Sequence, residues 1–335
     1  RDEFLAAWKA SGVTCIFQNA GRESQDPLCL LRRLGYFTFA LDMLRDFLVR
    51  VTDAEDILTA KKQNRGALAL SVNGVPLEQK WSSLPSEMGL IRTFFQLGVR
   101  MMHLTYNRRN MIGDGCAEPS DAGLSDFGRA VVAELNRTGI IVDVSHSGWR
   151  TSLEAARASS RPVVASHSSC AALHSHFRGK PDEVIRAIAD SGGFIGICGV
   201  AAFLGRSRDL RAMLDHIDYA VRKFGVDHVA IATDYSYRST ARGTEYGKIP
   251  VRRRLRAAWE SFWPTPIASY PSEQETMAWT NWPLFTVGLV QRGYSDLDIQ
   301  KIIGGNALRV VKAVFPPRPR ISPAVLNVGS AGGAK

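Results

Sequence analysis

The stretch GIIVDVSHSG, residues 139–148, decides the fold. It is a short apolar run that ends abruptly in polar residues, and the same form returns in RPVVASHSS (161–169) and HVAIATD (228–234). The apolar parts are continuous rather than alternating, which is typical of strands covered on both faces in a parallel sheet. We therefore expect parallel strands with polar residues at their carboxyl ends.

Apolar runs and amphipathic stretches alternate along most of the chain, the pattern of βα units around a parallel sheet. Strands are predicted at 13–17, 67–72, 99–105, 139–145, 162–166, 194–198 and 226–233, and helices at 124–136, 149–159, 181–190, 208–224 and 296–314. Ser125 is the expected N-cap of the first of these helices. An α/β fold of the (β/α)8 TIM-barrel type would need one strand beyond these seven, expected before Arg1. A doubly wound open sheet fits the same pattern.

The length of 335 residues suits one barrel. We expect a single barrel domain over residues 1–315, with an insertion rich in tryptophan and arginine at about 235–283, and an extended or mobile tail over 316–335. Long excursions in compact domains are usually functional or form interfaces. Because aromatic residues and arginine are enriched in interface cores, the insertion is also a candidate homodimer face.

Composition excludes several classes of protein. Mean hydropathy is −0.09 and no apolar run reaches about 18 residues, which argues against a membrane span. The 42 basic and 32 acidic residues give a net charge of +10. This excess is spread out and accompanies no nucleic-acid motif, so we expect no nucleic-acid partner. The compartment stays open: the cytoplasm, or the periplasm or exterior if a signal segment preceded Arg1.

The cysteines indicate neither disulfides nor a cysteine-based zinc site. They are odd in number and lack CxxC spacing, which favours buried free thiols. The five are Cys15, Cys29, Cys116, Cys170 and Cys198.

Three polar residues directly follow apolar runs: His146, His167 and Asp234. At the carboxyl ends of parallel barrel strands, such side chains converge on one mouth. Neutral imidazoles and a carboxylate suit zinc and leave a position for a water, which the ion acidifies. The alternative is that each is a satisfied histidine or a capping aspartate with no common centre. Arg178 could grip a substrate carboxylate bidentately, or be an ordinary surface arginine.

The other histidines are expected elsewhere. His103 lies inside a predicted strand three residues before Tyr106, which puts the two on opposite faces and makes His103 a core or helix-facing residue rather than a ligand. His174, His176 and His216 are expected in surface or supporting positions, and His228 at the opposite end of the barrel.

At these residues the sequence resembles the membrane (renal) dipeptidase family of zinc metallopeptidases. The resemblance runs from about residue 97 to 234 and resumes near 302. Its motifs are LGVRMMHLTYNRRN, GLSDFGRAVVAELNRTGIIVDVSHSG, RPVVASHSS, FRGKPDEVIRAIADSGGFIG, HIDYAVRKFGVDHVAIATD and IIGGNALRVV. It implies a (β/α)8 barrel with two zinc ions that hydrolyses dipeptides. It also implies that His146 and His167 hold one zinc, that Asp234 ligates the other and handles protons, and that Arg178 binds the substrate carboxylate.

The sequence departs from the family pattern at the metal-bridging position and around it. Asn73 stands in place of the bridging glutamate, and Tyr106 replaces the substrate-contacting histidine of an LTHN run. Ser236 occupies a position where a second carboxylate is common. The family's His-x-Asp pair, which binds the first zinc, has no counterpart in the sequence and could lie upstream of Arg1.

Charge then favours one zinc ion over two. Without the bridging anion, two dications would face little beyond Asp234, and their repulsion would go largely uncompensated. We expect one zinc on His146 and His167, completed by water and by Asp234 or, as a weak ligand, Asn73. A metal-free site is the alternative.

These residues predict a metal-dependent hydrolase that cleaves the amide bond of a dipeptide or a similar small molecule. Asp234 would be the general base, Tyr106 would polarise the oxyanion, and Arg178 would anchor a substrate carboxylate. One alternative is a barrel re-tasked for other small-molecule chemistry, with Tyr106, Asp234 and His167 as acid and base groups and little or no metal. Another is a non-catalytic binding protein that keeps the scaffold.

Overall fold

The computed structural model describes residues 1–21, 26–80, 83–237, 239 and 277–316. The described strands form one curled sheet in the order β1-β3-β4-β5-β6-β8-β9, with β2 beside β3 and β7 beside β6. The strands are β1 (Cys15–Asn19), β2 (Leu48–Arg50), β3 (Gly66–Val72), β4 (Val99–His103), β5 (Ile141–Asp143), β6 (Val163–Cys170), β7 (Gly179–Lys180), β8 (Phe194–Cys198) and β9 (Val229–Ala232). Every pairing of these strands is parallel.

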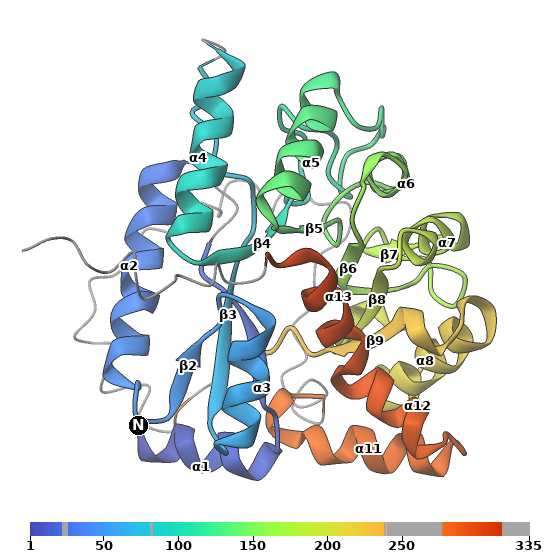
Figure 1. Ribbon diagram of the computed structural model, residues 1–335. Helices are drawn as coiled ribbons and strands as arrows, with labels where there is room; N and C mark the ends of the chain where they lie inside the picture. Colours follow the sequence, from blue (N-terminus) through green and yellow to red (C-terminus); the bar gives the residue numbers. More distant parts are fainter. Residues whose placement is uncertain (22–25, 81–82, 238, 240–276, 317–335) are drawn as a thin grey trace, which may run out of the picture.

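Helices connect the strands and lie around the curled sheet (Figure 1). This arrangement confirms the predicted barrel-type α/β fold. The helices are α1 (Asp2–Ser11), α2 (Pro27–Met43), α3 (Ala54–Lys62), α4 (Leu84–Gln96), α5 (Asp126–Thr138), α6 (Trp149–Ala158), α7 (Asp182–Asp190), α8 (Leu210–Phe224), α11 (Trp282–Gln291), α12 (Asp296–Gln300) and α13 (Asn306–Val314).

All seven predicted strands are present, with ends shifted by a few residues, and β2 and β7 are additional. The continuous apolar runs are buried along their whole length in β3, β4, β5 and β8. This is the expected consequence of a sheet covered on both faces. The predicted helix over 296–314 is divided, because a π-helical turn at Lys301–Gly305 separates α12 from α13. The turn contains the pair Gly304 and Gly305, a usual place for a helix to kink.

The sequence of α5 and β5 shows how the start and end of the helix position the strand that precedes His146. Ser125 caps α5, as predicted, with its hydroxyl oxygen accepting from the Gly128 amide at 2.9 Å. The helix ends at Gly139, whose φ of 87° is in the left-handed region that a side chain would disfavour. The chain then enters β5, which is fully buried and ends at Asp143, three residues before His146.

Parts of the predicted domain organisation fall outside the described residues. The insertion at 235–283 is described only at 235–237, 239 and 277–283, and the tail only at residue 316. Within the described part, Trp279 packs against Trp8 and Phe4 at ring-centroid distances of 5.5 and 6.2 Å. All five cysteines are free thiols, as predicted, but only Cys170 and Cys198 are buried. No described helix is long and apolar enough to cross a membrane.

Gly196 in β8 supplies a test of the sheet packing. A Cβ at this position would lie 2.0 Å from the carbonyl oxygen of Ser166, a backbone atom next to His167. We expect Gly196→Ala to lower the free energy of unfolding by about 1–3 kcal/mol, the usual cost of overpacking. Gly89→Ala in α4 is the matched control, because no heavy atom lies within 4 Å of its Cβ position. There the gain in helix propensity should stabilise the protein by about 0.5–1 kcal/mol. Urea denaturation measures both, and equal midpoints for Gly196→Ala and the wild type would contradict the packing.

Candidate active site

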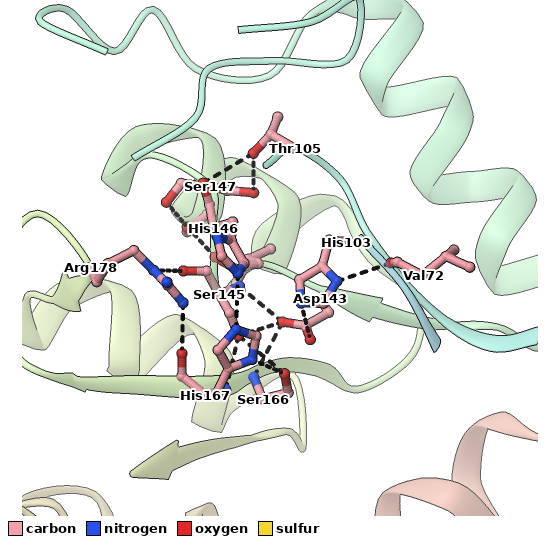
Figure 2. A network of polar contacts seen from close by, with 12 residues as sticks. Val72, His103, Thr105, Asp143, Ser145, His146, Ser147, Ser166, His167 and Arg178 are labelled. Carbon is pink, nitrogen blue, oxygen red and sulfur yellow. Dashed lines mark hydrogen bonds and ion pairs between the residues drawn. The ribbon is translucent and has the colours of Figure 1, made fainter. Parts of the chain in front are cut away.

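Three histidines from adjacent strands meet at the carboxyl end of the sheet. His103 ends β4, His146 follows β5, and His167 lies within β6. One ring nitrogen of each lies within 4.8 Å of those of the other two. Figure 2 shows the three rings close together, with Asp143 beside them. This donor set could hold a metal ion.

His146 and His167 face each other through their Nε2 atoms, which are 2.9 Å apart. The Nδ1 of His146 donates to Asn107 Oδ1 at 2.7 Å, because an amide oxygen can only accept. The Cys116 thiol donates to the same oxygen at 3.2 Å. The His146 Nε2 atom therefore carries a lone pair. The Nδ1 of His167 is bonded to the hydroxyl of Ser166 at 2.8 Å.

The surroundings keep both rings neutral. Burial, followed by the charge of Arg178, holds the pKa of His146 well below its ordinary value. Burial also lowers the pKa of His167, to about 4, although the negative charge of Asp234 acts in the opposite direction. Neutral imidazole is the form that ligates metals. The pair therefore fits a metal ion at neutral pH.

A buried contact between His103 and Asp143 lies next to His146 and His167. Nδ1 of His103 donates to the carbonyl oxygen of Val72 at 3.0 Å, and Nε2 lies 3.0 Å from Asp143 Oδ2. The other carboxylate oxygen of Asp143 accepts from the amide and hydroxyl of Ser145 at 2.9 and 2.7 Å, and from the amide of Ser166 at 3.2 Å. Burial works against both charges, but each partner's charge prevails. The pKa of His103 is raised and that of Asp143 is held well below its usual range.

His103 is buried, as expected of a core residue, but its ring lies beside His146 and His167 instead of facing a helix. The alternation of faces from His103 to Tyr106 does not apply, because β4 ends at His103. The parallel register places His103 beside Asp143. Tyr106 stacks on His146 instead, with ring centroids 4.0 Å apart and planes at 23°.

Arg178 is a buried residue and not a surface arginine, with only 2% of its surface exposed. Its Nε donates to the carbonyl of Ser145 at 3.2 Å, and its Nη2 to that of His167 at 3.1 Å. Its guanidinium lies 4.9 Å from the ring centroid of Phe203. Among the described residues no carboxylate pairs with it. Arg178 therefore links two strand ends and brings an uncompensated positive charge to the site.

Lys180 is a second buried cation, and the sequence reasoning missed it. Its ammonium donates to the Ser147 carbonyl at 2.6 Å and to the Ser152 hydroxyl at 2.9 Å, and burial lowers its pKa to about 8. The signal was its position two residues after Arg178, which puts both side chains on one face of an extended segment. Together they give the site a field that attracts anions.

The remaining predicted residues lie around the histidine group rather than in it. Asp234 follows β9 in a left-handed conformation (φ 49°) and is exposed, and its atoms do not belong to the group within 4.8 Å. Asn73 is buried just beyond β3, and Ser236 is exposed. His216 is buried, with Nδ1 accepting from the Cys170 amide at 3.0 Å, which makes it structural.

The lowered pKa of His167 predicts acid sensitivity. The unfolded chain takes up this proton near pH 6.5, whereas the folded chain resists protonation until about pH 4. The unfolded state therefore binds more protons in this window, and the free energy of unfolding should fall as pH drops from 6.5 to 4. Urea midpoints across this range should show a smaller slope for His167→Gln than for the wild type. Equal slopes in the two proteins would contradict the assignment.

Comparison with known proteins places the chain in a family. The model of the membrane dipeptidase family (peptidase family M19) matches residues 26–247. The chain is 27% identical over 289 residues to a dipeptidase, verJ, of Clonostachys rogersoniana, covering 82% of this chain and 64% of the relative. It is 28% identical over 272 residues to a dipeptidase, aclJ, of Aspergillus oryzae, covering 79% and 56%. The chain thus spans less than two thirds of the length of these curated relatives.

Solved structures support the same fold. An amidohydrolase from Pseudomonas aeruginosa superposes with a TM-score of 0.78 at 26% identity, covering 94% of this chain and 93% of that one. A metallopeptidase from Rhodobacter sphaeroides, liganded with a phosphinate mimic of the dipeptide L-Ala-D-Ala, gives a TM-score of 0.70 at 19% identity, covering 93% and 90%. The second likeness concerns the fold alone. Since the family model covers well over half of the sequence, the chain belongs to the membrane dipeptidase family.

Proposed function

We propose that this protein is a metal-dependent hydrolase that cleaves the amide bond of a dipeptide or a dipeptide-like small molecule. The observation that carries the proposal is the pair of neutral imidazoles, His146 and His167, with Nε2 atoms 2.9 Å apart. The guanidinium of buried Arg178 donates hydrogen bonds to the backbone carbonyls of Ser145 and His167. Two ligand nitrogens beside an unpaired cation suit a substrate that carries both a scissile carbonyl and a carboxylate.

The metal would be one zinc ion held by His146 and His167. Completing ligands would be water and Asp234, with Asn73 as a weak alternative. When bound, the ion would polarise the carbonyl and lower the pKa of a bound water. A single ion agrees with the charge of the site, because Asn73 is neutral and Arg178 and Lys180 already contribute positive charge.

The chain's own residues would bind the substrate and move its protons. Asp234 lies close enough to affect the pKa of His167, and its exposed carboxylate would take a proton from the attacking water. Tyr106 stacks on His146, so its hydroxyl is held near the metal ligands and would donate a hydrogen bond to the developing oxyanion. The guanidinium of Arg178 has N–H groups beyond the two that bind carbonyls, and these would anchor the substrate carboxylate.

A second candidate is small-molecule acid/base chemistry without a metal. It is favoured by Asn73 at the bridging position and by the place of Asp234 outside the histidine group. Tyr106, Asp234 and His167 would then be the proton-transfer groups.

Metal removal separates the two candidates. The purified chain should contain about one zinc or similar ion per molecule. We expect dialysis against a strong chelator to abolish dipeptide hydrolysis and added zinc, manganese or cobalt to restore it. Asp234→Asn in the reloaded protein should lower kcat by about 10²–10⁴-fold, the usual contribution of a general base. Full activity in the presence of chelator would favour the metal-free candidate.

Arg178 predicts a dependence on the substrate's carboxylate. A charged hydrogen bond contributes about 1.5–3 kcal/mol, so Arg178→Gln should raise KM for a dipeptide about 10- to 100-fold. The corresponding dipeptide amide lacks the carboxylate and should be hydrolysed equally by both proteins. Circular dichroism checks that the variant is folded, since Arg178 also bonds to two backbone carbonyls. Equal losses on the acid and the amide would contradict this role.

A further inference from the structure

The proposed function leaves His103 without a role, although its ring lies beside both proposed metal ligands. Its centroid is 5.2 Å from that of His146 and 5.4 Å from that of His167, with both pairs edge to face. Only 2% of its surface is exposed. A histidine this deeply buried between two metal-ligand candidates requires an explanation.

The contacts of His103 leave Nε2 as the nitrogen available to an ion. Because Nδ1 donates to the Val72 carbonyl, Nε2 is the nitrogen left for any other partner. Nε2 lies 3.0 Å from Asp143 Oδ2 in a buried ion pair, whose geometry falls short of a hydrogen bond. A metal ion bound at Nε2 would replace the proton of the ring as the positive partner of this buried carboxylate.

The order of the strands in the sheet brings the three imidazoles together. β4, β5 and β6 are consecutive neighbours in the sheet, and each contributes one histidine at or just beyond its carboxyl end. Ligand nitrogens around a tetrahedral zinc at about 2.0–2.1 Å lie roughly 3.3 Å from one another. The His146 and His167 nitrogens, at 2.9 Å, already have nearly this spacing. A nitrogen of His103 lies within 4.8 Å of the other two, so a movement of up to about 1.5 Å, within the reach of side-chain torsions, brings it to the ion.

We propose that His103 is the third protein ligand of a single metal ion held by His146 and His167. This inference rests on the proposed function, because it concerns the ion that the hydrolysis would use. The Val72 carbonyl would hold the other ring nitrogen of the ligand. Asp143 would lie beside the ion as its counter-charge, with its other oxygen fixed by Ser145 and Ser166. His103 would take the ligand position given above to Asp234 and would lose its second proton to the ion, because metals bind neutral imidazole. Three imidazoles would then hold one ion, with one position left for water and with Asp234 kept as the general base. Such a site needs no bridging carboxylate, in agreement with Asn73.

Cobalt(II) titration of tag-free apoprotein tests the ligand set without reference to activity. The proteins compared are the wild type, His103→Gln, His146→Gln and the control His228→Gln. We expect the wild type and His228→Gln to bind one cobalt ion with the intense visible absorption of tetrahedral nitrogen ligation. His103→Gln and His146→Gln should each bind at least about tenfold more weakly, with altered spectra.

The outcomes separate this inference from the function on which it rests. If His103→Gln binds cobalt like the wild type while His146→Gln does not, the contact with Asp143 is only an ion pair, and the inference is overturned while the metal-dependent function stands. If the wild type binds no metal, both are overturned. Should His103→Gln fail to fold, X-ray absorption of the zinc-loaded wild type decides the question. Three imidazoles in the first coordination shell support the inference, and two contradict it.

Discussion

The buried carboxylate of Asp143 is the interaction on which the site depends. One oxygen accepts three hydrogen bonds from Ser145 and Ser166, and the other faces His103. These contacts join the carboxyl ends of β4, β5 and β6, the strands that present the three histidines. An isolated buried charge is costly, and removing one partner of a buried pair typically costs about 3–5 kcal/mol. The fold therefore fixes the histidines by satisfying this one carboxylate.

Around that carboxylate, the described buried side chains of the site are either neutral or positively charged. His146 and His167 are kept neutral, while Arg178 and Lys180 are buried cations that bond to carbonyl and hydroxyl oxygens. Among the described residues, neither cation has a carboxylate partner. A site so built attracts anions. The same field agrees with our proposal of a single metal ion, because a second dication would add to the repulsion.

The sequence predicted the strands and two of the site histidines, but not the buried polar residues packed around them. Apolar runs ending in polar residues predicted the strands that lead to His146 and His167, because parallel strands must gather their carboxyl ends at one edge. His103 could not be placed this way, since the face of a residue is fixed by alternation only while the strand continues, and β4 stops there. Lys180 was missed because β7 is only two residues long and leaves no periodicity. The burial of Arg178 depends on carbonyls from two other strand ends, which spacing along the chain does not reveal.

The central claim, that neutral imidazoles are prepared to bind one metal ion, is tested most directly by nitrogen NMR of ¹⁵N-histidine-labelled protein at pH 7. We expect His146 to be neutral with its proton on Nδ1. We also expect the Nε2 resonances of His146 and His167 to move to metal-bound positions with one equivalent of zinc and not to change with a second. Imidazolium signals for these two residues, or spectra unaltered by zinc, would contradict it.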